Sequence, residues 1–419
     1  MFLQYPTVPR FLSFLEANKS PFLKSTRQSS LPLYSFIFQF PARVSLDTTE
    51  DQIHSLLYSV PIRYRKRTIK SYIQRPPILV PSNGNGETFE DARRVFVLSD
   101  LHTDYSENMS WVNSLSTKRY RKDVLLVAGD VAETCNNFVL TMSVLKDRFK
   151  HVFFVPGNHD LWRRSKGEKH LDSLEKLNRL LDGCKRLGVE TSPMMVDGLG
   201  IIPLFSWYHE SFDKEKDITG VRILSLEMAC KDFHACKWPD ELSSKDVSLA
   251  LYFDAMNEQN QHKIGEIQRS CNQIITFSHF LPRQELCPEK RMLFYPNLHK
   301  IIGSDSLEVR IRSIHGTDGS PSACHVFGHT HFCWDAVLQG IRYMQAPLAY
   351  PRERKRRMNG GEDWLPFCIY SSGKADQGVG SLSEKMSTCY WSDYYSINSR
   401  QPDNTELAPW VAKLYAKRS

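Results

Sequence analysis

Several short apolar segments of this chain end in side chains that can bind a metal ion. In "HVFFVPGNHD" (151–160), the run Val-Phe-Phe-Val predicts a buried strand, a Pro-Gly pair ends it, and Asn158, His159 and Asp160 follow at once. The same change from apolar to polar ends the segments "VFVLSDLH", "LLVAGD", "TFSH" and "FGHTH". Ligands of open α/β sheets collect beyond the carboxyl ends of the strands, so we expect these side chains to meet at one site.

The apolar segments alternate with helical patterns. The strand-like runs "RVFVLSD" and "DVLLVAGD" precede a helix expected over about 134–148, and "HVFFVPGNHD" precedes a second over about 168–187. In the second helix leucines recur every three or four residues, which indicates core packing, and Gly188 supplies the stop. The runs "GLGIIPLFSWY", "QIITFSHF" and "CHVFGHTH" follow, with a surface helix expected near 255–269. This alternation predicts an α/β fold.

The character of the sequence changes along the chain. Residues 1–90 are expected to form a leader and linker, because "PPILVPSNGNGETFED" mixes Pro, Gly and Asn just before the first strand-like run. Residues 91–350 are expected to form the main domain. Within it, residues 206–273 turn polar and irregular, which predicts an insertion over one end of the sheet. Residues 351–419 form a tail to which the sequence assigns no role.

The tail has two distinctive stretches. The basic run "RERKRR" (352–357) has the composition of a nuclear-localisation patch, although charge runs are usually solvated. The second stretch, "CYWSDYYSINS", is rich in aromatic residues. Trp364, Tyr390 and Trp391 are expected to pack back on the domain, with contact to a partner as the alternative.

The net charge of +7 is concentrated in the leader. Residues 1–90 hold 11 Lys and Arg against 6 Asp and Glu, whereas the remaining residues hold 43 against 41. The first 45 residues contain a single acid, Glu16, and seven serines. An acid-poor, Ser-rich and basic start is typical of organelle transit peptides, so the sequence predicts a plastid or mitochondrial protein. The alternative is a disordered extension on a cytoplasmic protein.

Composition also excludes some classes of protein. Nowhere do 18 apolar residues follow one another, so the sequence predicts no membrane span. The ten cysteines are scattered without a Cys-x-x-Cys pair, which indicates reduced thiols rather than a disulfide framework. Beyond residue 90 the chain is nearly neutral, which disfavours a nucleic-acid partner.

The side chains at the strand ends narrow the choice of metal. Carboxylates, imidazoles and one amide oxygen, without a thiolate, suit Mn²⁺, Fe²⁺, Zn²⁺ or Mg²⁺. The candidates are too many for one ion and suit two divalent ions that share a carboxylate. The predicted ligands are Asp100, His102, Asp130, Asn158, His279, His329 and His331.

These residues carry a family resemblance. Asp-x-His at 100–102, Gly-Asp at 129–130, Gly-Asn-His-Asp at 157–160, His279 and Gly-His-Thr-His at 328–331 resemble the motifs of the calcineurin-like metallophosphoesterase superfamily, in the family's order. The resemblance implies a sandwich of two mixed β-sheets flanked by helices. It also implies hydrolysis of a small phosphomonoester, phosphodiester or nucleotide-type substrate through attack by a hydroxide that bridges two metal ions.

The resemblance further implies a role for each matching residue. One ion would be held by Asp100, His102 and His331, the other by Asn158, His279 and His329, and Asp130 would bridge them. His159 would protonate the leaving oxygen or stabilise developing charge, a contribution of typically about 10²–10⁴-fold. Asp160 would orient the imidazole of His159.

Other polar residues leave alternatives open. His299 or His315 competes with His279 for the ligand position, whereas His151 and His325 open strands and are expected to be structural. Three residues are possible substrate-lining groups, with surface or helix-cap roles as the alternative: His209, Arg163 and Arg164.

Departures from subfamily patterns narrow the substrate, and two rival functions stay open. The Asp-Arg-Gly of Ser/Thr protein phosphatases is absent from "GDVAETC", and Glu133 stands where purple acid phosphatases have an iron-binding Tyr. The rivals are a nuclease, which would want a basic groove with stacking aromatics, and a non-catalytic metal-binding scaffold. Because all motif residues are present, the sequence favours the enzyme.

Overall fold

The structure of this protein is a computed structural model that describes residues 93–416, apart from residues 321, 357–360, 373–379 and 387–388. The predicted leader and linker therefore lie outside the described residues, and so does the sequence on which the prediction of organelle import depends.

One sheet is five-stranded, in the order β11-β10-β1-β2-β3. Its strands β1, β2 and β3 are parallel, while β10 runs antiparallel to β1 and β11 antiparallel to β10. The bounds are β1 Arg94–Leu98, β2 Val124–Ala128, β3 His151–Val155, β10 Phe367–Ser371 and β11 Ser381–Leu382. The tail, to which the sequence assigns no role, thus supplies the strand beside β1.

The other sheet is six-stranded, in the order β4-β5-β6-β7-β9-β8. Its four inner strands are parallel, and β4 and β8 pair antiparallel at the edges. The bounds are β4 Met194–Val196, β5 Leu199–Pro203, β6 Gln273–Phe277, β7 Cys324–Phe327, β8 Trp334–Leu338 and β9 Ile341–Gln345. Both sheets are mixed, which confirms the predicted fold class.

The two sheets share an apolar inner core. Val97, Leu126 and Phe153 of one sheet pack with Ile275 and Phe277 of the other. Alternate residues of the same strands, such as those of β2, face an outer core that includes the helices. Strands buried on both faces have near-continuous apolar sequences, and this explains why the sequence shows runs rather than alternation.

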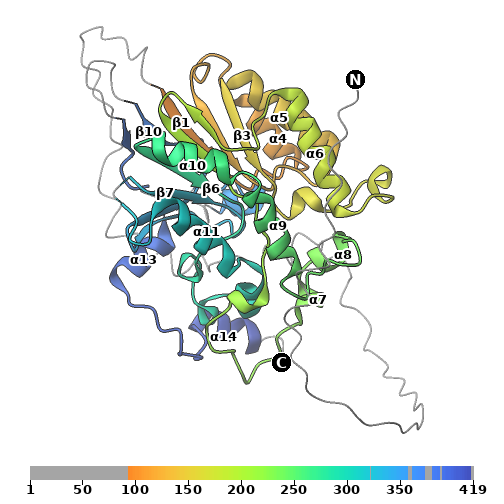
Figure 1. Ribbon diagram of the computed structural model, residues 1–419. Helices are drawn as coiled ribbons and strands as arrows, with labels where there is room; N and C mark the ends of the chain where they lie inside the picture. Colours follow the sequence, from red (N-terminus) through yellow and green to blue (C-terminus); the bar gives the residue numbers. More distant parts are fainter. Residues whose placement is uncertain (1–92, 321, 357–360, 373–379, 387–388, 417–419) are drawn as a thin grey trace, which may run out of the picture. The chain divides into compact units, whose positions relative to one another are not determined.

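Helices cover the outer faces (Figure 1). α4 (Ser106–Ser114), α5 (Cys135–Arg148) and α6 (Ser173–Leu187) lie on the five-stranded sheet, and α9 (Ser248–Glu258), α10 (Gln261–Ser270) and α11 (Asp305–His315) lie beside the other. α6 starts later than predicted, because Asp172 and Glu175 form a capping box there. It ends as predicted at Gly188, whose φ is 68°.

The helix predicted near 255–269 is two helices. α9 ends at Glu258 and α10 starts at Gln261. Asn257, near the end of α9, is buried, and its amide bonds the backbone N and O of Phe205. This tie to the loop after β5 fixes the direction of α9. The insertion also contains α7 (Leu226–Ala229) and α8 (Asp232–Ala235).

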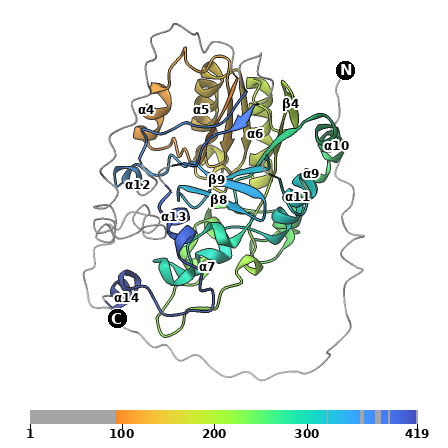
Figure 2. The ribbon, with the colours of Figure 1, turned by 90° about the vertical axis from the view of Figure 1, so that its left-hand side faces the viewer.

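The described C-terminal segments pack on the domain (Figure 2). α12 (Pro351–Lys355) follows β9 in the chain, and α13 (Tyr390–Ile397) lies beside β8. α14 (Pro409–Ala416) comes after α13 in the chain. Trp391 is buried, as the sequence predicts, and the indole of Trp410 donates to the carbonyl of Met292. In the part of the chain that the structure describes, no helix has both the length and the apolar character to cross a membrane.

Candidate metal centre

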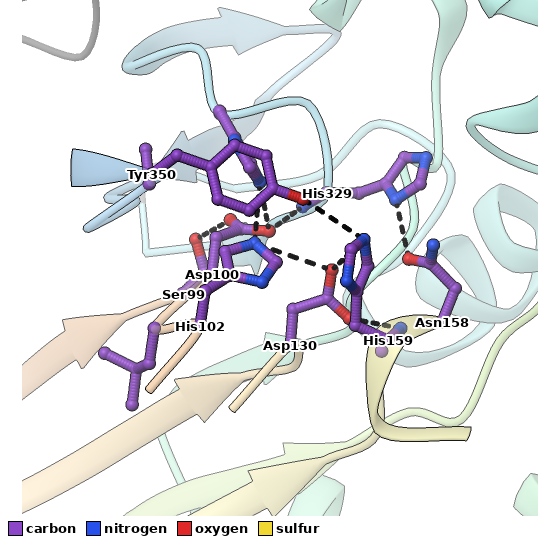
Figure 3. Close-up of polar contacts among 12 residues, drawn as sticks. Ser99, Asp100, His102, Asp130, Asn158, His159, His329 and Tyr350 are labelled. Atoms are coloured by element: carbon purple, nitrogen blue, oxygen red, sulfur yellow. Dashed lines mark hydrogen bonds and ion pairs between the residues drawn. The ribbon is translucent and has the colours of Figure 1, made fainter. Parts of the chain in front are cut away.

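The carboxyl ends of strands from both sheets meet at one buried cluster of polar side chains (Figure 3). Ligand atoms lie within 4.8 Å of one another in three overlapping groups, and every residue in them is buried. The groups are Asp100, His102 and His331; Asp130, His279 and His329; and His102, Asp130 and His159. The loops after β1, β2, β3, β6 and β7 supply these residues, as the strand-end pattern predicts.

The first ligand group (Asp100, His102 and His331) brings the Nε2 atoms of two imidazoles together, with the rings inclined at 61°. Nε2 of His102 lies 3.0 Å from Nε2 of His331, which in turn lies 3.5 Å from Oδ1 of Asp100. Nδ1 of His331 lies 2.8 Å from Oε2 of Glu353. Burial disfavours the charged ring, but the carboxylates of Glu353 and Asp100 together raise the pKa of His331. With Nδ1 donating to Glu353, a metal ion at Nε2 would displace the proton from that nitrogen and take its lone pair. Neutral imidazole with a free lone pair is the form that binds a metal.

His279 and His329 of the second group are joined by Asn158, and these three residues are called the second ligand group below. Each of them makes a hydrogen bond on its outer side that leaves an acceptor atom facing inward. Nδ2 of Asn158 donates to Asp232 Oδ1 at 2.9 Å, so its Oδ1 faces inward. Nδ1 of His279 donates to Ala128 O at 2.9 Å, and Nε2 of His329 donates to Ile301 O at 3.1 Å.

Because these hydrogen bonds use the donors of Asn158, His279 and His329, the inward-facing atoms of the three side chains are all acceptors. The inward nitrogens of His279 and His329 each lie 3.1 Å from Oδ1 of Asn158, and all three atoms then present lone pairs to the same space. Lone pairs at that distance repel unless a cation lies among them. The donor set therefore fits a divalent metal ion.

Asp130 belongs to two of the three groups and lies within reach of ligands on both sides of the site. Its Oδ2 is 3.5 Å from Nε2 of His279 and 4.0 Å from Nε2 of His102, while its Oδ1 accepts from the backbone N–H of His159. Burial, and then the charges of Asp160 and Asp100, raise the pKa of Asp130 well above its usual value. Burial lowers the pKa of His279 to about 4, so this ring is neutral. Cations at the site would compensate the buried carboxylates.

The backbone at the ligands is strained. Asp100, His102, Asp130, His329 and His331 all have positive φ, between 43° and 76°. Each such non-Gly residue costs roughly 1–3 kcal/mol, and such strain gathers at functional sites. Gly157 makes room for the cluster, because a Cβ there would collide with the carboxylate of Asp130.

His159 stands beside the ligand groups. Its ring stacks on Trp162 with centroids 3.6 Å apart, and its Nε2 lies 4.0 Å from Asp130 Oδ2 and 3.4 Å from the hydroxyl of Tyr350. Its Nδ1 lies 3.5 Å from Oε1 of Glu133. The imidazole thus has the carboxylate of Glu133 on one side and the cluster of candidate metal ligands on the other.

Asp160 does not take the role expected of it. Its carboxylate is fully buried and accepts from four backbone amides, those of Gly157, Asp130, Val131 and Ala132. Asp160 therefore fixes the loop after β2, and Glu133 is the carboxylate beside His159. The physical reason is local: Asp160 is the middle residue of a short 3-10 helix, His159–Leu161, and from there its carboxylate meets the N–H groups of the loop after β2.

The three possible substrate-lining residues are each engaged by another group of the protein. Nδ1 of His209 accepts from Ser211 N at the start of the 3-10 helix Glu210–Phe212. A guanidinium nitrogen of Arg163 lies 3.2 Å from Lys169 O. Nε of Arg164 pairs with Oε2 of Glu133 at 2.8 Å, which places Arg164 one step behind His159.

The competing histidines lie outside the ligand groups. Nε2 of His299 bonds Pro288 O, while His315 and His325 both bond the hydroxyl of Thr276. Only His279 of these candidates is among the grouped ligands.

Five residues of the site were missed from the sequence: Glu133, Glu353, Asp232, Tyr350 and Lys176. The buried ammonium of Lys176 donates to Glu133 O at 2.6 Å and also to Trp162 O, below the loops that carry Glu133 and His159. For Lys176, the sequence held one signal, because this lysine lies on the apolar face of the amphipathic helix α6. Glu353 was hidden in a basic run, and nothing in the sequence marked Asp232 or Tyr350.

Comparisons with known proteins show what this chain is similar to. The family model for calcineurin-like phosphoesterases matches residues 93–333. The [acyl-carrier-protein] phosphodiesterase PptH of Mycobacterium tuberculosis is 26% identical over 288 residues, which cover 65% of this chain and 83% of the relative. The uncharacterized protein L509 of Acanthamoeba polyphaga mimivirus is 21% identical, over 61% of this chain and 91% of its own. The crystal structure of the M. tuberculosis phosphopantetheinyl hydrolase covers 63% of this chain and 92% of its own, with 26% identity and a TM-score of 0.46.

Proposed function

The chain belongs to the calcineurin-like phosphoesterases and is a metal-dependent hydrolase of phosphate esters, and we propose that it is a phosphodiesterase that works with two divalent ions. The observation that carries the proposal is the pair of inward-facing ligand groups on either side of Asp130. Asp100, His102 and His331 would hold one ion. Asn158, His279 and His329 would hold the other.

The protein's own residues then account for the proton transfer. When bound, two divalent cations would neutralise phosphate oxygens and lower the pKa of a shared water molecule. Nε2 of His159 faces the cluster, so its proton can pass to the leaving oxygen. Glu133 stabilises the protonated ring from Nδ1, and Arg164 holds Glu133 in place.

Tyr350 adds a second donor beside that proton. Its hydroxyl lies 3.4 Å from Nε2 of His159, and its ring packs on His102 with centroids 4.4 Å apart. Burial raises the pKa of Tyr350 well above its usual value, so the hydroxyl stays protonated. It can therefore donate to an oxygen of the substrate beside His159.

Two observations favour a diester over a monoester. A diester bears one negative charge on its free oxygens and a monoester up to two, so a monoesterase gains more from arginines at the site. Here Arg163 binds a backbone carbonyl, and Arg164 is paired with Glu133.

The M. tuberculosis relative is named a phosphodiesterase of acyl carrier protein, and a second name for it is phosphopantetheinyl hydrolase. We therefore place the substrate of this chain among phosphodiesters that join a phosphopantetheinyl group to a carrier protein.

The test is an assay of metal-stripped full-length protein with Mn²⁺, Mg²⁺, Zn²⁺ or Fe²⁺ added back. The substrates are p-nitrophenyl phosphate, bis-p-nitrophenyl phosphate and a carrier protein that bears phosphopantetheine, followed by intact mass. We expect metal-dependent cleavage of the two diesters, lost in Asp130→Asn and His159→Ala and kept in the surface variant Asp240→Asn. Preference for the monoester would overturn the diesterase, and cleavage of the aryl diester alone would overturn the carrier-protein substrate.

A further inference from the structure

Two cysteines far apart in the sequence meet in the described structure. The sulfur of Cys333 lies 2.8 Å from the sulfur of Cys389, which is closer than two unbonded sulfur atoms approach in van der Waals contact. Both residues are buried, Cys333 with 3% and Cys389 with 0% of its surface exposed. Other cysteine sulfurs of the described chain contact different groups, such as Met344 for Cys324.

Each of the two cysteines immediately precedes an ordered element, β8 for Cys333 and α13 for Cys389. Cys333 follows the ligand His331 by two residues and immediately precedes β8. Cys389 immediately precedes α13, and its carbonyl accepts from the hydroxyl of Ser392.

The same hydroxyl ties α13 to β8. It accepts from the backbone N–H of Asp335, whose carboxylate accepts in turn from the N–H of Met386. The strand end that follows the metal-ligand loop and the start of the C-terminal helix are thereby fixed against each other. The close approach of the two sulfurs is part of this packing rather than an isolated contact.

We propose that Cys333 and Cys389 are an intramolecular disulfide site. In its formation each thiol gives up one proton and one electron, and a bond joins the two sulfurs. The two electrons reduce a small disulfide of the glutathione type, whose own sulfur–sulfur bond breaks to give two thiols. A dithiol reverses the reaction.

The bond would have a structural consequence at the metal centre. It closes a loop between residues 333 and 389, and so restricts the unfolded chain. It also ties α13 covalently to the segment that carries His329 and His331. The sequence predicts reduced thiols because no Cys-x-x-Cys is present, and a pair separated by more than 50 residues leaves no such local motif.

The experiment treats the purified full-length protein with glutathione disulfide, then denatures it and alkylates the remaining thiols. Intact mass counts the alkyl groups, and digestion identifies the joined peptides. We expect two fewer alkyl groups than the ten cysteines allow, and one peptide that joins Cys333 to Cys389. Cys333→Ser and Cys389→Ser should each abolish that peptide, whereas Cys324→Ser, a buried cysteine of β7, should keep it.

Both sulfurs are buried, so glutathione disulfide could fail to reach them in the folded protein, and the experiment includes a control for this. The oxidation is repeated at a urea concentration just below the unfolding transition and during oxidative refolding. Alkylation of all ten cysteines under every condition would overturn the proposal, as would a dominant bond to any other cysteine. Where the bond forms, the oxidised protein should melt at a higher temperature than its reduced form, and Cys389→Ser should show no such difference.

Discussion

Oε2 of Glu353 lies 2.8 Å from Nδ1 of His331 and also accepts from the backbone N–H of Tyr350. A carboxylate of α12 thus orients an imidazole of the β7 loop and fixes the residue whose hydroxyl reaches His159. Such partners set the tautomer of a ligating histidine and hold its ring in place. The C-terminal segment is therefore part of the metal centre.

Glu353→Gln should weaken metal binding at the first ligand group by about 10–100-fold, because the amide is a poorer acceptor for the imidazole proton. Calorimetric titration of the metal-stripped protein with Mn²⁺ measures the change. Glu107→Gln is the matched control, since Glu107 is exposed and pairs with Lys355 of the same α12. Equal affinities of the two variants would contradict the positioning role.

Asp232→Ala should weaken the second ligand group and destabilise the fold. Oδ1 of Asp232 accepts from Asn158 Nδ2 and from the indole N–H of Trp162, and the variant leaves both buried donors without this acceptor. Each such donor costs roughly 1–3 kcal/mol. Urea unfolding and Mn²⁺ titration check the two effects, with Asp240→Ala as a control. A variant that loses stability but keeps both metal sites would limit Asp232 to a packing role.

The sequence predicted the parts of the fold in which local pattern and tertiary structure agree. α5 lies within a residue of its predicted bounds, and the apolar runs are strands of the two sheets. The ligand candidates were identifiable because each follows the carboxyl end of a strand, and in open α/β sheets these ends meet where ligands bind.

The residues that support the ligands were not predictable in the same way. Glu353, Asp232 and Tyr350 reach the site from separate segments, and each is defined by a tertiary contact without a local pattern. Asp160 shows the converse problem. Its adjacency to His159 suggested an interaction with the imidazole, but the turn directs its carboxylate to the backbone of the β2 loop.

Tyr350→Phe should lower kcat most for diesters with poor leaving groups. The variant keeps the ring that packs on His102 and removes the hydroxyl 3.4 Å from His159. Loss of one hydrogen bond to a charged group should lower kcat by about 10–100-fold for a diester with an alkyl leaving group. The decrease in kcat should be smaller for bis-p-nitrophenyl phosphate, because p-nitrophenolate leaves without a proton. Kinetics on both diesters test this, with Tyr105→Phe as the neighbouring control. An equal loss on both diesters would indicate a structural effect instead.

The stability of the protein should fall as pH drops below about 6.5, and His299 should account for part of the loss. Burial lowers the pKa of His299 to about 4, although Asp213 and Glu215 lie 3.9 and 3.6 Å away. The imidazole of His299 is therefore protonated below about pH 6.5 in the unfolded chain, but only below about pH 4 in the folded chain. The contribution is complete above the unfolded pKa and is lost across this interval, at a cost of roughly 3 kcal/mol.

His299→Gln removes that proton and can still bond Gln284 and Pro288, the present partners of the imidazole. Urea unfolding over a pH series from neutral to about 4 should therefore show a shallower loss of stability for the variant, whatever its stability at neutral pH. His262→Gln is the control, because the side chain of His262 is 85% exposed. If the two variants and the parent protein lose stability in parallel, the neutral His299 is not a source of the acid sensitivity.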